Sequence, residues 1–233
     1  MKHPYPKIER YKILYARFLQ GDRSKQLMDL AGDFKDKVFL DICCGEGLLT
    51  LEAIKRQAKL ALAVDSNPQM WGKRLDKIDK VFTFSQKIEA ALTSIKEGTN
   101  RWRQYPRIDI AICQQGINYW LDDEVGVRMA NVMTDKGVFI FNTFNEKPSN
   151  SLKIKKYNLN GKNYIEITWG SPNISYYDIQ HVQICEGFPP HTTQFKWLSD
   201  EYIKFCLEKY FEIELIKNGK TSIYVCIRKD KNG

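Results

Sequence analysis

The sequence of 233 residues predicts an α/β fold with a doubly wound, mostly parallel sheet, and three observations support this prediction. Short apolar runs, which suit buried strands, alternate with segments whose apolar residues recur at helical spacing. A glycine-rich turn joins the first apolar run to a helical segment. The chain ends in antiparallel patterns around tight turns. Right-handed crossovers between parallel strands would place helices on both faces of the sheet.

The predicted elements follow one another in a regular order. Strands are expected at 38–42, 60–64, 81–85, 108–113 and 138–141. Helices are expected at 8–20, 23–31, 48–54, 68–78, 88–95, 122–133 and 199–210. Two Asn-Gly pairs, at 160–161 and 218–219, each predict a hairpin turn, and the second hairpin has strands at 211–216 and 221–227.

The glycine-rich turn after the first strand is the most informative segment. Gly45 and Gly47 separate an apolar strand from a helical segment, a construction in which a ligand can approach backbone N–H groups at a helix N-terminus. The second strand ends in Asp65, and a carboxylate at this strand tip is where the hydroxyls of a nucleotide ribose are bound. In this order the two features predict a cofactor that contains adenosine.

Two residues near the turn distinguish between adenosine cofactors. Thr50 stands where a dinucleotide-binding fold has its third glycine, and Asp41 stands just before the turn. A carboxylate at that place repels a pyrophosphate but attracts an ammonium or a sulfonium group. S-adenosylmethionine carries both cations and no phosphate, so the sequence favours it as the cofactor.

These segments resemble motifs I and II of the class I S-adenosylmethionine-dependent methyltransferases, in particular those that act on small molecules. The motif I pattern Asp-x-Gly-Cys-Gly-x-Gly corresponds to Asp41 through Gly47, but its first glycine is Cys43, which narrows the backbone's approach to the methionine part of the cofactor. The resemblance implies that Asp65 binds the ribose diol. It also implies that Met70 packs against adenine, although an ordinary core methionine explains Met70 equally well.

The resemblance implies a Rossmann-like seven-stranded sheet with helices on both faces. In this fold a sixth strand and an antiparallel seventh strand complete the sheet, which agrees with the predicted C-terminal hairpin. One structural domain is expected: N-terminal helices at 1–35 that cap the cofactor site, a cofactor-binding core at 36–148, an antiparallel β-rich insertion at 149–197 over the active site, and a C-terminal helix and hairpin at 198–233.

The resemblance also assigns cofactor contacts residue by residue. Family members often have an acid after the third strand that binds the adenine amino group, but Lys87 stands there, so the backbone near Ile88 or the Gln86 side chain would serve instead. Gln114 could hydrogen-bond the methionine end. The predicted cofactor-binding residues are Asp41, Cys43, Cys44, Gly45, Gly47, Asp65, Ser66, Met70, Lys87, Ile88 and Gln114.

Tyr119 and His191 are the candidate catalytic residues. Methyl transfer is an in-line displacement that needs chiefly alignment and the exclusion of water, so the fold does not require a base in every case. Tyr119 follows the carboxyl end of the fourth strand. Asn118 and Tyr119 can be read in two ways: both side chains face the acceptor, or Asn118 caps the next helix and the ring of Tyr119 packs in the protein interior. His191 follows two prolines on a predicted loop and is the best available imidazole base.

Charge and motifs bound the class of acceptor. The net charge of +8 is spread along the chain, which favours a solvated basic surface, although aromatics beside basic residues leave nucleic-acid binding open. The Asn/Asp-Pro-Pro-Tyr/Phe motif of DNA and RNA amino-methyltransferases is absent from the sequence. The sequence therefore predicts methyl transfer to a nitrogen or oxygen of a small molecule. An RNA or protein methyltransferase and a non-catalytic cofactor-binding subunit are the alternatives.

The cysteines and the lengths of the apolar runs indicate the cellular compartment. Six cysteines occur without a Cys-x-x-Cys pair, which indicates reduced thiols and neither a disulfide framework nor a metal site. No apolar run approaches the ~20 residues of a membrane span, and the N-terminus lacks the apolar region of a signal peptide. A cytoplasmic enzyme without membrane contact is expected, and its oligomeric state is not predicted.

Overall fold

The computed structural model describes residues 22–71, 74–98, 105–144, 147–148, 150–159, 161–172, 176–218 and 221–230. The helix predicted at 8–20 lies outside the described residues, as does the second half of the Asn-Gly pair at 218–219.

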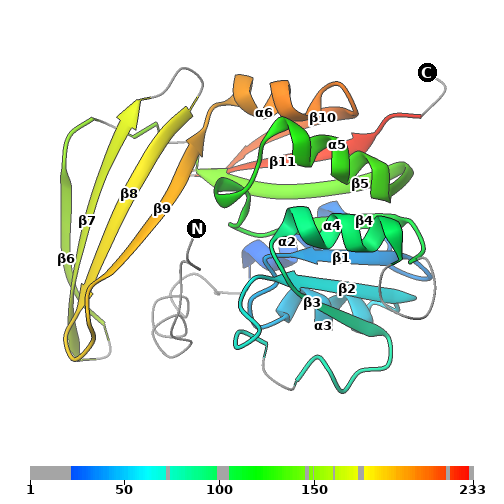
Figure 1. The fold of residues 1–233 in the computed structure, drawn as a ribbon, viewed down its shortest axis with the longest axis horizontal. Helices are drawn as coiled ribbons and strands as arrows, with labels where there is room; N and C mark the ends of the chain where they lie inside the picture. Colours follow the sequence, from blue (N-terminus) through cyan, green and yellow to red (C-terminus); the bar gives the residue numbers. More distant parts are fainter. Residues whose placement is uncertain are drawn as a thin grey trace.

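A seven-stranded sheet forms the centre of the molecule, with the strand order β10-β11-β5-β4-β1-β2-β3 (Figure 1). The strands β1 to β5 are parallel, whereas β11 runs antiparallel to both of its neighbours, β5 and β10. The predicted sheet and its terminal hairpin are therefore confirmed. The bounds are β1 (Val38–Ile42), β2 (Leu60–Asp65), β3 (Val81–Ser85), β4 (Ile108–Cys113), β5 (Met133–Phe144), β10 (Phe211–Asn218) and β11 (Thr221–Arg228).

Helices cover both faces of this sheet (Figure 1). One apolar cluster packs α4, α5 and α6 against one face, and a second packs α2 and α3 against the other. Asp122 and Ser199 cap α5 and α6, and each side chain accepts a hydrogen bond from the backbone N–H three residues later. The bounds are α2 (Asp22–Leu30), α3 (Leu48–Lys55), α4 (Ile88–Glu97), η1 (Ile117–Tyr119), α5 (Asp123–Val132) and α6 (Asp200–Leu207).

The helix predicted at 68–78 is wrong. The described residues between β2 and β3, which are 66–71 and 74–80, form turns and bends. Asp65 Oδ1 accepts the N–H of Asn67 at 3.0 Å, and Asn67 Oδ1 accepts the N–H of Gln69 at 3.1 Å. Such local side-chain bonds give the backbone N–H groups partners outside a helix, and they outweigh the favourable position of Pro68.

A second, four-stranded antiparallel sheet has the order β6-β7-β8-β9 and confirms the predicted β-rich insertion. It stands beside the end of β5 (Figure 1). The loop predicted around His191 is wrong at that residue, because His191 begins a strand and pairs with Gln183 of the neighbouring strand. The bounds are β6 (Lys153–Leu159), β7 (Lys162–Pro172), β8 (Tyr176–Cys185) and β9 (His191–Leu198).

Candidate active site

The carboxyl ends of β1, β2 and β4 meet at one edge of the large sheet, because the three strands are parallel and pair in register. The turn after β1, the Asp65 tip of β2 and the segment after β4 therefore lie together. Open α/β sheets bind ligands at this edge.

The turn after β1 is shaped by left-handed backbone at three positions: Cys43 with φ 57°, Gly45 with φ 53° and Gly47 with φ 74°. A Cβ on Gly47 would lie 2.6 Å from Leu75 Cδ1, so the left-handed conformation disfavours a side chain here, and any side chain would require Leu75 to move. Cys43 adopts the left-handed region with a side chain, which costs about 1–2 kcal/mol.

The thiol of Cys43 occupies a space that Gly116 leaves open. Gly116 has φ −105°, which any residue adopts, yet a Cβ there would lie 2.6 Å from both Cβ and Sγ of Cys43. The thiol of Cys113 interacts with the thiol of Cys43. This contact is the larger cause and burial the second, and both raise the pKa of Cys43 well above its ordinary value. Cys43 is thus a protonated, packed thiol and a poor nucleophile.

Asp65 is oriented by two backbone groups. Its Oδ2 accepts the N–H of Gly45 at 3.0 Å, its Oδ1 accepts the N–H of Asn67 at 3.0 Å, and the residue is 7 % exposed. A carboxylate offers about four acceptor positions. A carboxylate fixed in this direction can accept hydrogen bonds from the two hydroxyls of a ribose.

Asp41 holds the first turn of α3. Its Oδ2 accepts hydrogen bonds from Thr50 Oγ1 at 2.6 Å and from the Thr50 N–H at 3.0 Å. Burial raises the pKa of Asp41 to about 7, the bonds from Thr50 oppose this rise, and the charge of Asp65 adds to it. The sequence pattern shows Thr50 only as a missing glycine, whereas the structure gives it this anchoring contact.

The remaining predicted cofactor residues differ in exposure and surroundings. Cys44 is buried, its N–H donates to the carbonyl of Val64 at 3.0 Å, and burial raises the pKa of its thiol. Met70 is also buried, whereas Ser66 next to Asp65 is exposed.

Three more of the predicted residues lie at the starts of segments. Lys87 is the N-cap residue of α4, and Ile88, the first residue of that helix, packs in the core. Gln114 accepts a hydrogen bond through Oε1 from Ser24 Oγ of α2 at 2.9 Å. This contact joins α2 to the segment after β4, and no sequence pattern predicts it.

Tyr119 contacts the second sheet. Its ring meets that of Phe195 in β9 edge to face, with centroids 6.0 Å apart, and Phe144 at the end of β5 lies 6.2 Å from Phe195. His191 is four residues before Phe195 on the same face of β9, which places it about 13 Å along the strand. The structure brings Tyr119 to the second sheet and sets His191 apart from that contact.

The face of the second sheet that carries Phe195 combines apolar and polar side chains. Gln183 and Thr193 on this face are buried, and His181 Nδ1 lies 3.4 Å from Thr168 Oγ1. Tyr157 donates a hydrogen bond to Glu166 Oε1 at 2.6 Å on the same face. A few polar side chains on an otherwise apolar surface can orient a polar ligand.

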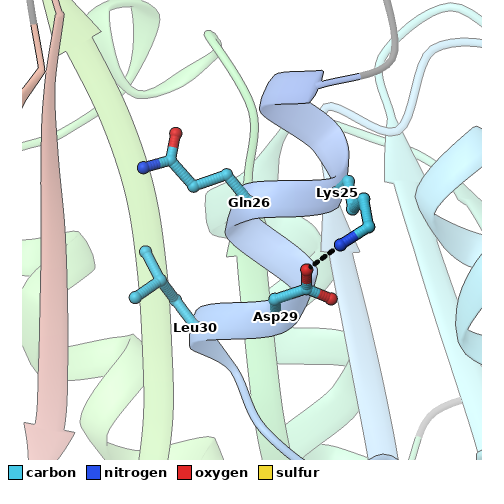
Figure 2. Close-up of a pocket in the computed structure, with 4 residues that line it drawn as sticks. All are labelled: Lys25, Gln26, Asp29 and Leu30. Atoms are coloured by element: carbon cyan, nitrogen blue, oxygen red, sulfur yellow. Dashed lines mark hydrogen bonds and ion pairs between the residues drawn. The ribbon is translucent and has the colours of Figure 1, made fainter.

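A hollow of about 480 Å³ lies on α2 (Figure 2). Its lining includes Gln26 and Leu30, and Lys25 Nζ forms an ion pair with Asp29 Oδ2 at 2.6 Å. The hydrogen bond from Lys25 lowers the pKa of Asp29. The pair is exposed and contributes little to stability.

Three further properties concern the described parts of the chain. Within them, no group of three or more His, Cys, Asp and Glu side chains has the arrangement of a metal site. None of their helices combines the length and apolar composition of a membrane span. All six cysteines are free thiols.

Comparisons with known proteins add the following. A family model described as "Conserved hypothetical protein 95" matches residues 23–110. No curated protein sequence matches the chain.

Solved structures match over nearly the whole chain. The amino pentose methyltransferase CalS10 of Micromonospora echinaspora, involved in calicheamicin biosynthesis, has a TM-score of 0.67 at 11 % identity and covers 97 % of this chain and 100 % of its own. The chain has the methyltransferase fold. The methyltransferase CcbJ of Streptomyces caelestis gives a TM-score of 0.70 at 9 % identity, with 94 % of this chain and 96 % of its own covered. The sugar N-methyltransferase KedS8 of Streptoalloteichus gives 0.62 at 12 % identity, with 93 % and 92 % covered.

Proposed function

We propose that this chain is an S-adenosylmethionine-dependent methyltransferase that methylates a nitrogen or oxygen of a small molecule. The observation that carries the proposal is the Asp65 carboxylate, which two backbone N–H groups orient beside the left-handed turn at the carboxyl edge of the sheet. The arrangement suits an adenosine with free ribose hydroxyls.

When bound, S-adenosylmethionine supplies an electrophilic methyl group on a sulfonium. The residues of this chain then have distinct tasks. Asp65 accepts hydrogen bonds from the ribose hydroxyls, and the buried thioether of Met70 packs against the adenine. Asp41 holds α3 through Thr50, so that the turn from Cys43 to Gly47 keeps its backbone directed at the methionine part.

The second sheet covers the acceptor in this proposal, and α2 covers the cofactor. Buried polar side chains on the face that carries Phe195 suit an acceptor with hydroxyl or amino groups. Two of the similar structures are an amino pentose methyltransferase and a sugar N-methyltransferase, which favours nitrogen over oxygen. An amine that arrives neutral needs no base, and His191 or Tyr119 would matter more for a hydroxyl. The free thiols agree with a reducing, cytosolic compartment.

Transfer of tritium from methyl-labelled S-adenosylmethionine tests the proposal. Label is expected in the small-molecule fraction of a cell extract, with the Asp65→Ala variant as the inactive control. Label in total RNA or in protein would instead support the alternative acceptors. Binding of S-adenosylhomocysteine without any transfer would support a non-catalytic cofactor-binding subunit, and no binding at all would refute the proposal.

A further inference from the structure

The segment after β4, residues 114–119, contacts both sides of the proposed active site. On the cofactor side, the N–H of Gln115 donates to Asn142 Oδ1 at 2.9 Å, and Gln115 has a left-handed φ of 59°. On the acceptor side, Asn118 Nδ2 donates to the backbone carbonyl of Lys196 in β9 at 2.7 Å. Thr143 Oγ1 in turn donates to Asn118 Oδ1 at 3.0 Å.

Burial makes these hydrogen bonds costly to lose. Asn118 is 2 % exposed and Thr143 is 3 % exposed, so water does not readily replace a missing partner. Leaving such a group unsatisfied costs about 1–3 kcal/mol. Both polar ends of the Asn118 amide are used, and its orientation is therefore fixed.

Asn118 contacts β9, which stands at the edge of the second sheet as far as the described strands show. β9 is the last strand in the order of the second sheet, and among the described strands only β8 pairs with it. The amide of Asn118 gives the Lys196 carbonyl on this strand a donor from η1, the helix that follows β4 of the large sheet. The ring of Tyr119, the residue after Asn118, packs edge to face against Phe195, the residue before Lys196.

We infer that Asn118 is a positioning residue, which holds the second sheet at the distance from the cofactor edge that methyl transfer requires. The inference rests on the proposed function. Asn142 and Thr143 are consecutive in β5 and divide the work: Asn142 fixes the turn on the cofactor side, and Thr143 fixes Asn118 on the acceptor side. Substitution of Asn142 should therefore affect cofactor binding, whereas substitution of Thr143 or Asn118 should affect binding of the acceptor.

The test compares Thr143→Val, which removes the hydroxyl but keeps the shape, with Thr143→Ser, which keeps the hydroxyl. Asn118→Leu is the direct variant. Calorimetry measures the affinity for S-adenosylhomocysteine. Hydrogen exchange of β9 amides in the intact protein measures how firmly Asn118 holds β9. Initial rates at increasing amounts of the methyl-accepting metabolite fraction give the maximal rate and the half-saturating amount.

In Thr143→Val and Asn118→Leu we expect β9 amides to exchange about tenfold faster and the half-saturating amount to rise about tenfold. Affinity for S-adenosylhomocysteine should stay within about twofold. Thr143→Ser should restore wild-type values, which a loss of overall stability would not predict. Asn142→Ala should show the opposite pattern, with weaker S-adenosylhomocysteine binding and unchanged β9 exchange.

Unchanged β9 exchange in Thr143→Val would overturn the inference, as would a loss of cofactor affinity as large as the rise in the half-saturating amount of acceptor. If wild-type protein binds no S-adenosylhomocysteine, the proposed function fails, and the inference that depends on it fails for that separate reason. Wild-type binding and transfer with normal kinetics in both variants would leave the proposed function standing and refute only the role of Asn118.

Discussion

The turn at residues 43–47 and the face of the second sheet that carries Phe195 are the two regions proposed to contact the reactants. Backbone atoms define the first region, whereas side chains define the second. In the turn, backbone groups make the defining contacts: Gly45 N–H binds Asp65, and Cys44 N–H binds Val64. In the second sheet, side chains such as Phe195, His181 and Gln183 form the surface. Substitutions can change the second surface without altering the fold, whereas they cannot readily change the first. One scaffold can thus keep its cofactor while its acceptor differs.

The largest expected effect is that of Asp65→Ala on the cofactor. The carboxylate's bonds to two ribose hydroxyls are charge-assisted and worth about 1.5–3 kcal/mol each, so affinity for S-adenosylhomocysteine should fall about a hundredfold or more. Calorimetry measures this loss. Asp65→Asn, which keeps an acceptor for the N–H of Gly45, is the matched control and should lose less. Equal affinity in wild type and Asp65→Ala would remove Asp65 from the cofactor site and weaken the contrast between the two regions.

A smaller effect is expected from Gly47→Ala, measured as the free energy of unfolding in urea. The new Cβ would meet Leu75 at 2.6 Å in a left-handed conformation, for a combined cost of about 2–5 kcal/mol. Gly187 has a similar φ of +82° and nothing within 4 Å of its ideal Cβ. Gly187→Ala should therefore show only the conformational part of the cost. If the two variants lose the same stability, the contact with Leu75 does not constrain the turn.

Measured per pH unit, the smallest effect is the pH dependence that Asp41 gives to the free energy of unfolding. Its pKa of about 7 in the folded protein lies above the ordinary 3.8, so the folded chain holds this proton more tightly than the unfolded chain. The stability that the bound proton contributes is complete below about pH 4 and is lost as the pH rises to about 7, at up to about 1.4 kcal/mol per pH unit.

Urea unfolding of Asp41→Asn between pH 4 and pH 7 isolates this contribution, since asparagine can accept the bonds from Thr50 without titrating. The variant should be less sensitive to pH than the wild type over that range. Parallel stability curves would show that Asp41 is charged throughout, and that it is available to attract a cation directly.

The sequence predicts most of the large sheet because its signals are local. The strand at 38–42, the turn with Gly45 and Gly47 and the Asp65 tip each follow from neighbouring residues, and their order implies the topology. The helix expected at 68–78 fails for a local reason too, because the side chains of Asp65 and Asn67 bind nearby N–H groups. Propensity patterns do not include such competing bonds.

The joint between the two sheets could not be predicted in the same way. Asn118, Thr143 and the Lys196 carbonyl come from three distant parts of the chain, and only the folded arrangement brings them together. A weak signal exists in the polar pair Asn142-Thr143, which follows an apolar strand at its carboxyl end. The assignment of His191 to a loop failed because pairing with β8 extends the strand to that residue. The roles predicted for Tyr119, His191 and the cofactor residues remain predictions.

The packing of Cys43 against Gly116 also constrains the order in which the two positions can change during evolution. A residue with a side chain at 116 collides with the thiol, so a glycine or an equivalent opening at 116 must be present before cysteine replaces glycine at 43. If residue 43 returns to glycine, the collision with Cys43 at position 116 disappears, and the close contact with Cys113 Sγ at 3.1 Å remains. Related chains should therefore show linked substitutions at these two sites, and a search that demands glycine at the first motif position will overlook the relatives in which the small residue has moved to the segment after β4.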